Sequence, residues 1–180
     1  MTTDISDFKL SLVIPVHNEE SCIPELTKEL VKYVTPLTRE YEIIFVDDHS
    51  GDHSLATIAS LASINPAIKC LSLSRNMGHQ VALACGLEAA TGDVVITMDG
   101  DLQHPPALIP RMVALWHDGF DVVNTVRHQS QGVGFVQGLL SKLFYRLFNK
   151  ISRIKLTPAG ADFRLLDRDC VDALHLLESL

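Results

Sequence analysis

Short apolar runs alternate with longer amphipathic segments through the first 126 residues of the chain. Residues 10–16 (LSLVIPV) are mostly apolar and include β-branched side chains, which is typical of a strand buried on both faces. Residues 25–34 instead place Leu26, Leu30 and Val34 at helical spacing. Strands are likewise expected at 42–46, 68–73, 94–98 and 121–126, and helices at 55–64, at 78–90 and from the pair Pro105-Pro106 onward.

This alternation predicts a single α/β domain over residues 1–180, with a mostly parallel sheet that helices cover on both faces. In such sheets, ligands bind outside the carboxyl ends of the strands, so we expect the site at that edge. Four strand ends supply its candidate residues: Pro15, His17, Asn18 and Glu19; Asp47, Asp48 and Ser50; Arg75 and Asn76; and Asp99, Asp101 and Gln103.

The charge balance excludes one class of partner. The chain has 15 basic and 22 acidic residues, a formal charge of -7, whereas a general nucleic-acid binder has a basic surface. A nucleotide-sugar site stays compatible with this balance, because a bound divalent cation can supply positive charge locally.

The absence of several sequence motifs argues against further classes of protein. The turn after the first expected strand, residues 15–21, has no glycine, which argues against the G-x-G-x-x-G motif of NAD or FAD binding. A P-loop is absent as well, and the four cysteines are too scattered for a zinc cluster or a disulfide framework. The chain also lacks a signal-peptide pattern at its start and an apolar stretch of about 18 residues that could span a membrane.

Asp99-Gly100-Asp101 is a candidate metal site. It directly follows an apolar strand, and two carboxylates separated by glycine can face one hard cation such as Mg²⁺ or Mn²⁺. Gln103 offers a third, neutral oxygen. Asp-Gly-Asp is also an ordinary turn sequence, so this motif alone leaves both interpretations open.

Asp47 and Asp48 end the neighbouring strand and can accept hydrogen bonds from a nucleobase or a ribose hydroxyl. The alternative is a capping role for this segment, since Ser50 and Asp52 stand just before an expected helix. The two roles are compatible if Ser50 or Asp52 caps the helix while Asp47 or Asp48 binds the ligand.

Several segments together resemble a known family. Residues 13–20 (VIPVHNEE), 46–50 (VDDHS), 75–80 (RNMGHQ), 98–106 (MDGDLQHPP) and 161–168 (ADFRLLDR) occur in that order. They resemble family 2 glycosyltransferases of the GT-A fold, in particular the polyprenyl-phosphate branch. That branch includes dolichol-phosphate mannosyltransferases and bacterial undecaprenyl-phosphate sugar transferases.

The resemblance implies roles for individual residues. Asp162 would act as a base or orient the acceptor, unless it only pairs with Arg164 or Arg168. His17 stands where dolichol-phosphate enzymes often have an aromatic residue, which leaves the nucleotide open. The resemblance implies that the nucleoside is bound by Pro15, His17, Glu19 and Asp47, and that substrate binding also involves Asp48, Asn76 and Asp99. It implies that Mg²⁺ or Mn²⁺ is held by Asp99, Asp101 and Gln103, and that Arg127 faces the phosphates. The implied catalytic residues are Asp101, Arg127 and Asp162.

A basic amphipathic helix is expected at residues 133–154. Lys142, Arg146, Lys150 and Arg153 share one helical face, and leucine and phenylalanine occupy much of the rest. Such a helix can lie at an anionic membrane surface. The alternative is a helix that packs on the core and has a solvated basic edge.

The implied reaction is inverting transfer of a hexose from a nucleoside-diphosphate sugar to undecaprenyl or dolichyl phosphate, at the cytoplasmic face of the membrane. A lipid phosphate, with a second pKa of about 6, is already ionised and needs no strong base. The rivals are a family 2 enzyme with a soluble or polysaccharide acceptor, and a non-catalytic nucleotide-sugar-binding module. Because Leu180 falls inside an apolar-periodic segment, we expect a C-terminal truncation, with any membrane anchor outside this chain. The base, the sugar, the polyprenol and the oligomeric state stay open.

Overall fold

The computed structural model describes residues 6–126 and 160–178. The chain divides into two compact units, Met1–Val123 with Asp162–Leu180, and Asn124–Ala161. Arg127 and the expected basic helix at 133–154 lie outside the described residues. They therefore stay predictions.

The sheet has six strands in the order β3-β2-β1-β4-β6-β5. Parallel pairing joins β1 to β2 and β4, and β2 to β3, whereas β4 and β6 run antiparallel. The predicted mostly parallel sheet is therefore confirmed. The strands are β1 (Ser6–Val16), β2 (Thr38–Asp47), β3 (Ile68–Ser72), β4 (Val94–Thr97), β5 (Val122–Val126) and β6 (Gly160–Asp167).

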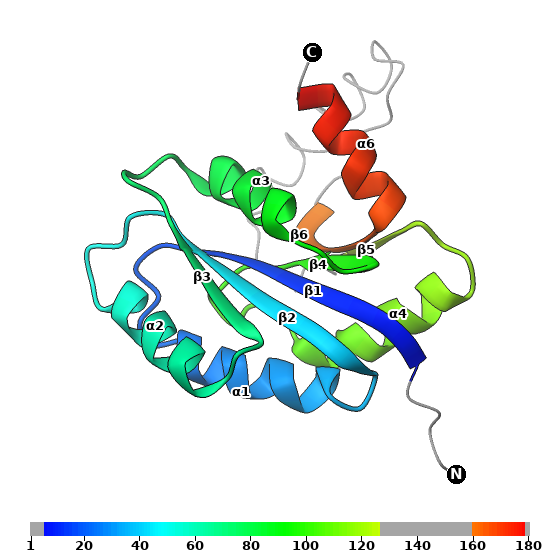
Figure 1. Cartoon of the computed structure of the whole chain (residues 1–180), viewed down its shortest axis with the longest axis horizontal. Helices are drawn as coiled ribbons and strands as arrows, with labels where there is room; N and C mark the ends of the chain where they lie inside the picture. The colour runs from blue at the N-terminus through cyan, green and yellow to red at the C-terminus, as the bar shows by residue number, and fades with distance from the viewer. Residues whose placement is uncertain (1–5, 127–159, 179–180) are drawn as a thin grey trace, which may run out of the picture. The chain divides into compact units, whose positions relative to one another are not determined.

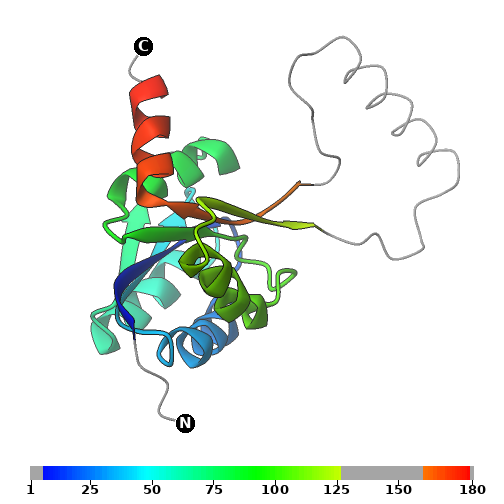
Figure 2. The same ribbon diagram turned by 90° about the vertical axis from the view of Figure 1, so that its right-hand side faces the viewer.

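Helices cover both faces of the sheet, as the sequence predicts. Helices α3 and α6 lie on one face, and α1, α2 and α4 lie on the other (Figures 1 and 2). Across the described ranges, no helix combines the length and the apolar character needed to cross a bilayer. The helices are α1 (Ile23–Val34), α2 (Ser54–Ile64), α3 (His79–Ala89), α4 (Ile109–His117, after a 3-10 turn at Pro106–Leu108) and α6 (Arg168–Glu178).

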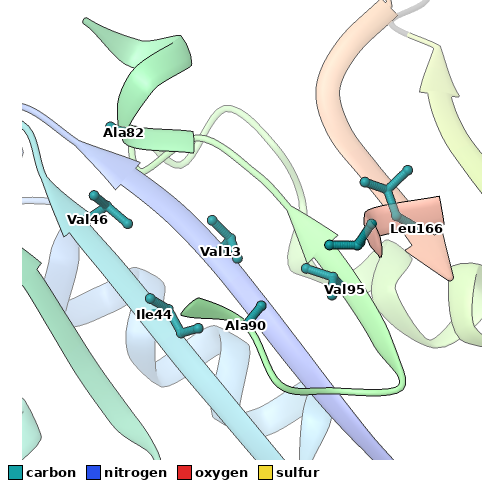
Figure 3. Close-up of a cluster of buried hydrophobic side chains, with 8 residues drawn as sticks. Val13, Ile44, Val46, Ala82, Ala90, Val95 and Leu166 are labelled. Carbon is teal, nitrogen blue, oxygen red and sulfur yellow. The ribbon is translucent and has the colours of Figure 1, made fainter. Parts of the chain in front are cut away.

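Helix α3 packs closely on the two central strands. Gly86 permits this approach, because a Cβ there would overlap Val13 and lie 3.0 Å from Val46 Cγ2. Around this contact, side chains from β1, β2, β4, β6, α6, α3 and the residue after α3 form one buried apolar cluster (Figure 3). The first residue of α3, His79, lies at the carboxyl edge of the sheet. The cluster comprises Val13, Ile44, Val46, Ala82, Ala90, Val95, Leu166 and Val171.

Strand β6 is the main departure from the sequence expectation, which placed no strand at 160–167. The strand is inserted between β4 and β5. At its end, Arg168 donates to the carbonyl oxygens of Ala90 (3.0 Å) and Gly92 and lies 3.5 Å from Asp172. Arg168 thus ties the turn after β6 to the turn before β4.

Glu42 of β2 is buried in a polar cluster that sequence analysis did not identify. Its Oε1 accepts hydrogen bonds from Ser11 Oγ (2.6 Å) and Thr91 N (2.7 Å), and Lys69 Nζ donates to Oε2. Burial alone would raise the pKa of Glu42, but the hydrogen bonds from Lys69, Ser11 and Thr91 outweigh it and lower the pKa to about 2. The carboxylate is therefore charged in the folded protein at neutral pH.

Candidate functional site

A cavity of about 350 Å³ lies where β1 and β4 end. The loops after β1, β2, β3 and β4 all contribute to its wall, so this cavity lies at the carboxyl edge, where the site is expected. The lining consists of Pro15, Val16, His17, Glu19, Asp48, Asn76, Gly78, His79, Asp99, Gly100 and Asp101.

Hydrogen bonds join the loop after β1 to the loop after β2. Asn18 N donates to Ser50 Oγ (3.0 Å), Gly51 N donates to Asn18 Oδ1 (2.7 Å), and Glu19 N donates to Ser54 Oγ (2.9 Å). Asn18 also adopts a left-handed backbone conformation, with φ 59°. Asparagine tolerates this conformation better than most residues, and such positions often occur at functional sites. The two loops thus form one connected wall.

Asp47 and Asp48 anchor loops from buried positions. Asp48 accepts hydrogen bonds from Met77 N (2.6 Å) and Gly78 N (2.8 Å), which fixes the loop between β3 and α3. Asp47 accepts from Ser50 N at 3.3 Å and from Ser72 Oγ at 3.5 Å. Of the two, Asp48 belongs to the cavity lining.

The capping interpretation also has structural support. Asp52 Oδ1 accepts a hydrogen bond from Ser54 N, the first residue of α2, at 2.9 Å. The other oxygen, Oδ2, accepts from Glu20 N at 3.2 Å. Asp52 therefore holds the start of α2, while Asp48 faces the cavity.

His17 and its neighbours form a polar wall. His17 Nδ1 lies 2.9 Å from the carbonyl oxygen of Asp48, and because a carbonyl only accepts, this hydrogen bond requires a proton on Nδ1. In the neutral ring, Nε2 is then an acceptor for Asn18 Nδ2 (3.0 Å) and Asn76 Nδ2 (3.3 Å). The wall thus combines one imidazole with two side-chain amides, which suits a ligand rich in hydrogen-bonding groups.

Asp99 lies between two histidines that sequence analysis did not assign. Its Oδ2 is 3.0 Å from His104 Nε2, and its Oδ1 is 3.6 Å from His79 Nε2. The His104 side chain is 7% exposed, and its ring centroid is 5.5 Å from that of Phe163 in β6. His104 belongs to the segment 98–106 quoted above, but its buried contact with Asp99 depends on the folded loop.

The Asp-Gly-Asp loop packs tightly against β1. A Cβ on Gly100 would lie 2.7 Å from Val16 Cγ1, so glycine is required at this distance. Asp101 Oδ1 accepts a hydrogen bond from Gln103 N at 3.0 Å, and Leu102 between them has φ 61°. This left-handed conformation is costly for a bulky residue and marks a constrained loop.

The donor set fits a divalent cation that is shared with a ligand. Asp99 and Asp101 both line the cavity, and carboxylate oxygens are the ligands that Mg²⁺ and Mn²⁺ prefer. Within residues 6–126 and 160–178, no group of three or more His, Cys, Asp or Glu residues could hold a metal ion. The remaining ligands would therefore come from substrate phosphates and water, as is common for Mg²⁺.

The structure brings most of the predicted site residues together. Asp47 is buried outside the lining, and Gln103 is exposed in the following loop. Asp162 lies in β6. His79 and Gly78 join the lining without having been predicted. The predicted residues that line the cavity are Pro15, His17, Glu19, Asp48, Asn76, Asp99 and Asp101.

Curated proteins with similar sequences are glycosyltransferases. An uncharacterized glycosyltransferase of Synechocystis sp. is 41% identical over 169 residues, covering 94% of this chain and 53% of that protein. The prophage bactoprenol glucosyl transferase homolog of Escherichia coli is 39% identical over 169 residues, covering 94% of this chain and 55% of that protein. The chain thus spans about half the length of these relatives.

Solved structures share the fold. A mannosyltransferase from Pyrobaculum calidifontis, in complex with GDP-Man and Mn²⁺, has a TM-score of 0.68 at 19% identity, covering 94% of this chain and 47% of its own. Glucosyl-3-phosphoglycerate synthase from Mycobacterium tuberculosis has a TM-score of 0.63 at 22% identity, covering 90% of this chain and 57% of its own. The fold is that of the GT-A glycosyltransferases.

The family match extends over nearly the whole chain, since residues 11–174 match the family described as "Glycosyl transferase family 2". These residues include the cavity lining and all of β6. The chain therefore belongs to glycosyl transferase family 2.

Proposed function

We propose that this chain binds a nucleoside-diphosphate sugar in the 350 Å³ cavity and transfers its hexose to a polyprenyl phosphate. The observation that carries the proposal is that Asp99 and Asp101 line the same cavity as the polar side chains of His17 and Asn76. Relatives named bactoprenol glucosyl transferases, 39–40% identical, favour glucose as the sugar and a lipid phosphate as the acceptor.

Two groups of lining residues would serve the two halves of the donor. His17, Asn76 and the buried Asp48 supply the hydrogen-bonding groups that a nucleoside needs. Asp99 and Asp101 supply oxygen ligands near the place where the diphosphate would lie. A bound Mg²⁺ or Mn²⁺ would neutralise the charge that develops on the leaving nucleoside diphosphate.

The acceptor side is proposed to involve β6. Its residue Asp162 is two positions before Arg164, and Phe163 between them contacts the ring of His104. A polyprenyl phosphate is ionised at neutral pH, so Asp162 is proposed to orient the acceptor rather than to remove a proton from it. The reaction is proposed to take place at the cytoplasmic face of a membrane.

Acceptor-dependent release of nucleoside diphosphate by the full-length protein tests this function. We expect Asp162→Asn to keep donor affinity, because Asp162 is proposed to act on the acceptor, and to lose most of the transfer to undecaprenyl phosphate. Donor affinity is measured by calorimetry and transfer by extraction of the labelled lipid. The exposed Asp118 in the turn after α4 provides the control, Asp118→Asn.

Three outcomes would contradict parts of the proposal. Wild-type transfer by Asp162→Asn would reduce Asp162 to a structural residue. Label that stays in the aqueous phase would indicate a soluble acceptor. Donor binding without turnover on any acceptor would indicate a non-catalytic binding module.

A further inference from the structure

A second cavity, of about 190 Å³, lies on the sheet face that α3 and α6 cover. Helix α3 supplies Gln80, Leu83 and Leu87, β4 supplies Thr97, β6 supplies Arg164, and α6 supplies Leu174. Thr97 and Arg164 are direct partners in the β4–β6 pairing. Four elements thus meet around one small space.

This second cavity is next to the donor cavity. On α3, His79 lines the donor cavity and the following residue, Gln80, lines the second cavity. After β4, Asp99 lines the donor cavity, while Thr97, two residues earlier, lines the second cavity. A ligand in the second cavity would therefore lie beside the diphosphate end of the donor site.

The second cavity has a polar part and an apolar part. Arg164, Gln80 and Thr97 provide a cation, an amide and a hydroxyl, whereas leucines line the rest. The apolar part reaches the surface at Leu174, which is 43% exposed. A helix as apolar as α3 is usually covered on most sides. An apolar surface beside a cationic group matches an amphiphilic anion.

We propose that the second cavity binds the phosphate end of the isoprenoid acceptor, an inference that rests on the proposed function. Arg164 pairs with the phosphate, because guanidinium groups bind phosphate oxygens through paired hydrogen bonds. The leucines contact the first isoprene units. An acceptor phosphate oxygen then forms a bond to the anomeric carbon, and the bond from that carbon to the nucleoside diphosphate breaks, with the electron pair leaving on the diphosphate.

Binding of farnesyl phosphate to this chain, measured by calorimetry, tests the inference. We expect Arg164→Gln and Leu174→Asp each to weaken farnesyl phosphate binding at least about 10-fold, by removing the cation or by placing a charge on the apolar wall. Arg164→Lys should restore part of the affinity, because the charge is kept. Arg111→Gln is the matched control, since Arg111 is exposed on α4, at the opposite face of the sheet.

Inorganic phosphate and farnesol separate the two halves of the ligand, and each should bind more weakly than farnesyl phosphate. The inference is wrong if farnesyl phosphate does not bind, if Arg164→Gln and Leu174→Asp leave its affinity unchanged, or if nucleoside diphosphate with Mn²⁺ displaces it. It is also wrong if inorganic phosphate binds equally well. If the chain still binds nucleotide in these cases, only the acceptor role of the second cavity is rejected. If the chain binds no nucleotide, the proposed function itself is contradicted.

Discussion

Asp99, a proposed metal ligand of the donor site, has a histidine side chain next to each of its two carboxylate oxygens. Its two oxygens face His104 at 3.0 Å and His79 at 3.6 Å, and no lysine or arginine of the described ranges forms an ion pair with it. The buried ring of His104 is held against Phe163, so it can fix the orientation of the Asp99 carboxylate. This arrangement links the Asp-Gly-Asp loop to β6.

Replacing His104 separates these two contacts. His104→Phe keeps an aromatic ring against Phe163 but cannot hydrogen-bond to Asp99, and His104→Gln keeps a donor without the ring. If His104 orients Asp99, we expect His104→Phe to weaken binding of nucleoside diphosphate with Mn²⁺ by about 3- to 10-fold, up to 1.4 kcal/mol. His104→Gln should bind more tightly than His104→Phe.

Melting temperature provides the control for folding. A purely structural His104 would instead give a lower melting temperature in both variants, with nucleotide affinity close to that of the wild type once folding is accounted for.

At the level of elements, Glu42 connects strands at the edge of the sheet away from the site. It joins Ser11 of β1, Lys69 of β3 and Thr91 before β4. Its pKa of about 2 in the folded protein is below the value of about 4.3 of an unfolded chain. The resulting stabilisation is present above pH 4.3 and is lost as the pH falls toward 2.

We therefore expect Glu42→Gln to lower the free energy of unfolding by about 3 kcal/mol at pH 7, with a smaller loss at pH 3. Urea unfolding at the two pH values measures both effects. Glu40→Gln is the matched control, because Glu40 is exposed on the same strand. An equal loss for Glu42→Gln at both pH values would show that the charge of Glu42 does not contribute.

The elements that the sequence predicts well are those with a local signal. The apolar runs in β1, β2 and β4 are continuous, and the helix α1 has regular spacing, so the parallel sheet and its carboxyl edge follow from local pattern. Strand β6 was missed because its place next to β4 depends on a pairing across about 70 residues of chain, as in Val94 with Asp167.

In the candidate site too, some residues could be predicted from local sequence and others depend on the folded structure. Asp99, Asp101 and His17 follow strands directly, and strand order alone brings them together. Sequence could not separate Asp48, which lines the cavity, from Asp47, which does not, because the outcome depends on the loops that each carboxylate anchors. His79 depends on where α3 begins, and Gly86 sets how closely that helix approaches the sheet.

In the whole molecule, one unit of the chain holds both the donor cavity, at the carboxyl edge of the sheet, and the second cavity, on the sheet face that α3 and α6 cover. This arrangement would bring the proposed nucleotide site and the proposed site for an amphiphilic phosphate next to each other. The chain spans about half the length of its curated relatives, so transfer itself is a property to be measured in the full-length protein.

Calorimetric titration of this chain with UDP and GDP tests the proposed metal-dependent nucleoside-diphosphate site at Asp99 and Asp101. With Mn²⁺ present, we predict binding of at least one nucleotide, weakened at least about 10-fold, or 1.4 kcal/mol, by EDTA and to the same extent by Asp101→Ala. Asp118→Ala, at an exposed position after α4, should bind like the wild type. Affinity that neither EDTA nor Asp101→Ala changes, or no nucleotide binding at all, would contradict a metal-dependent nucleotide site at these residues.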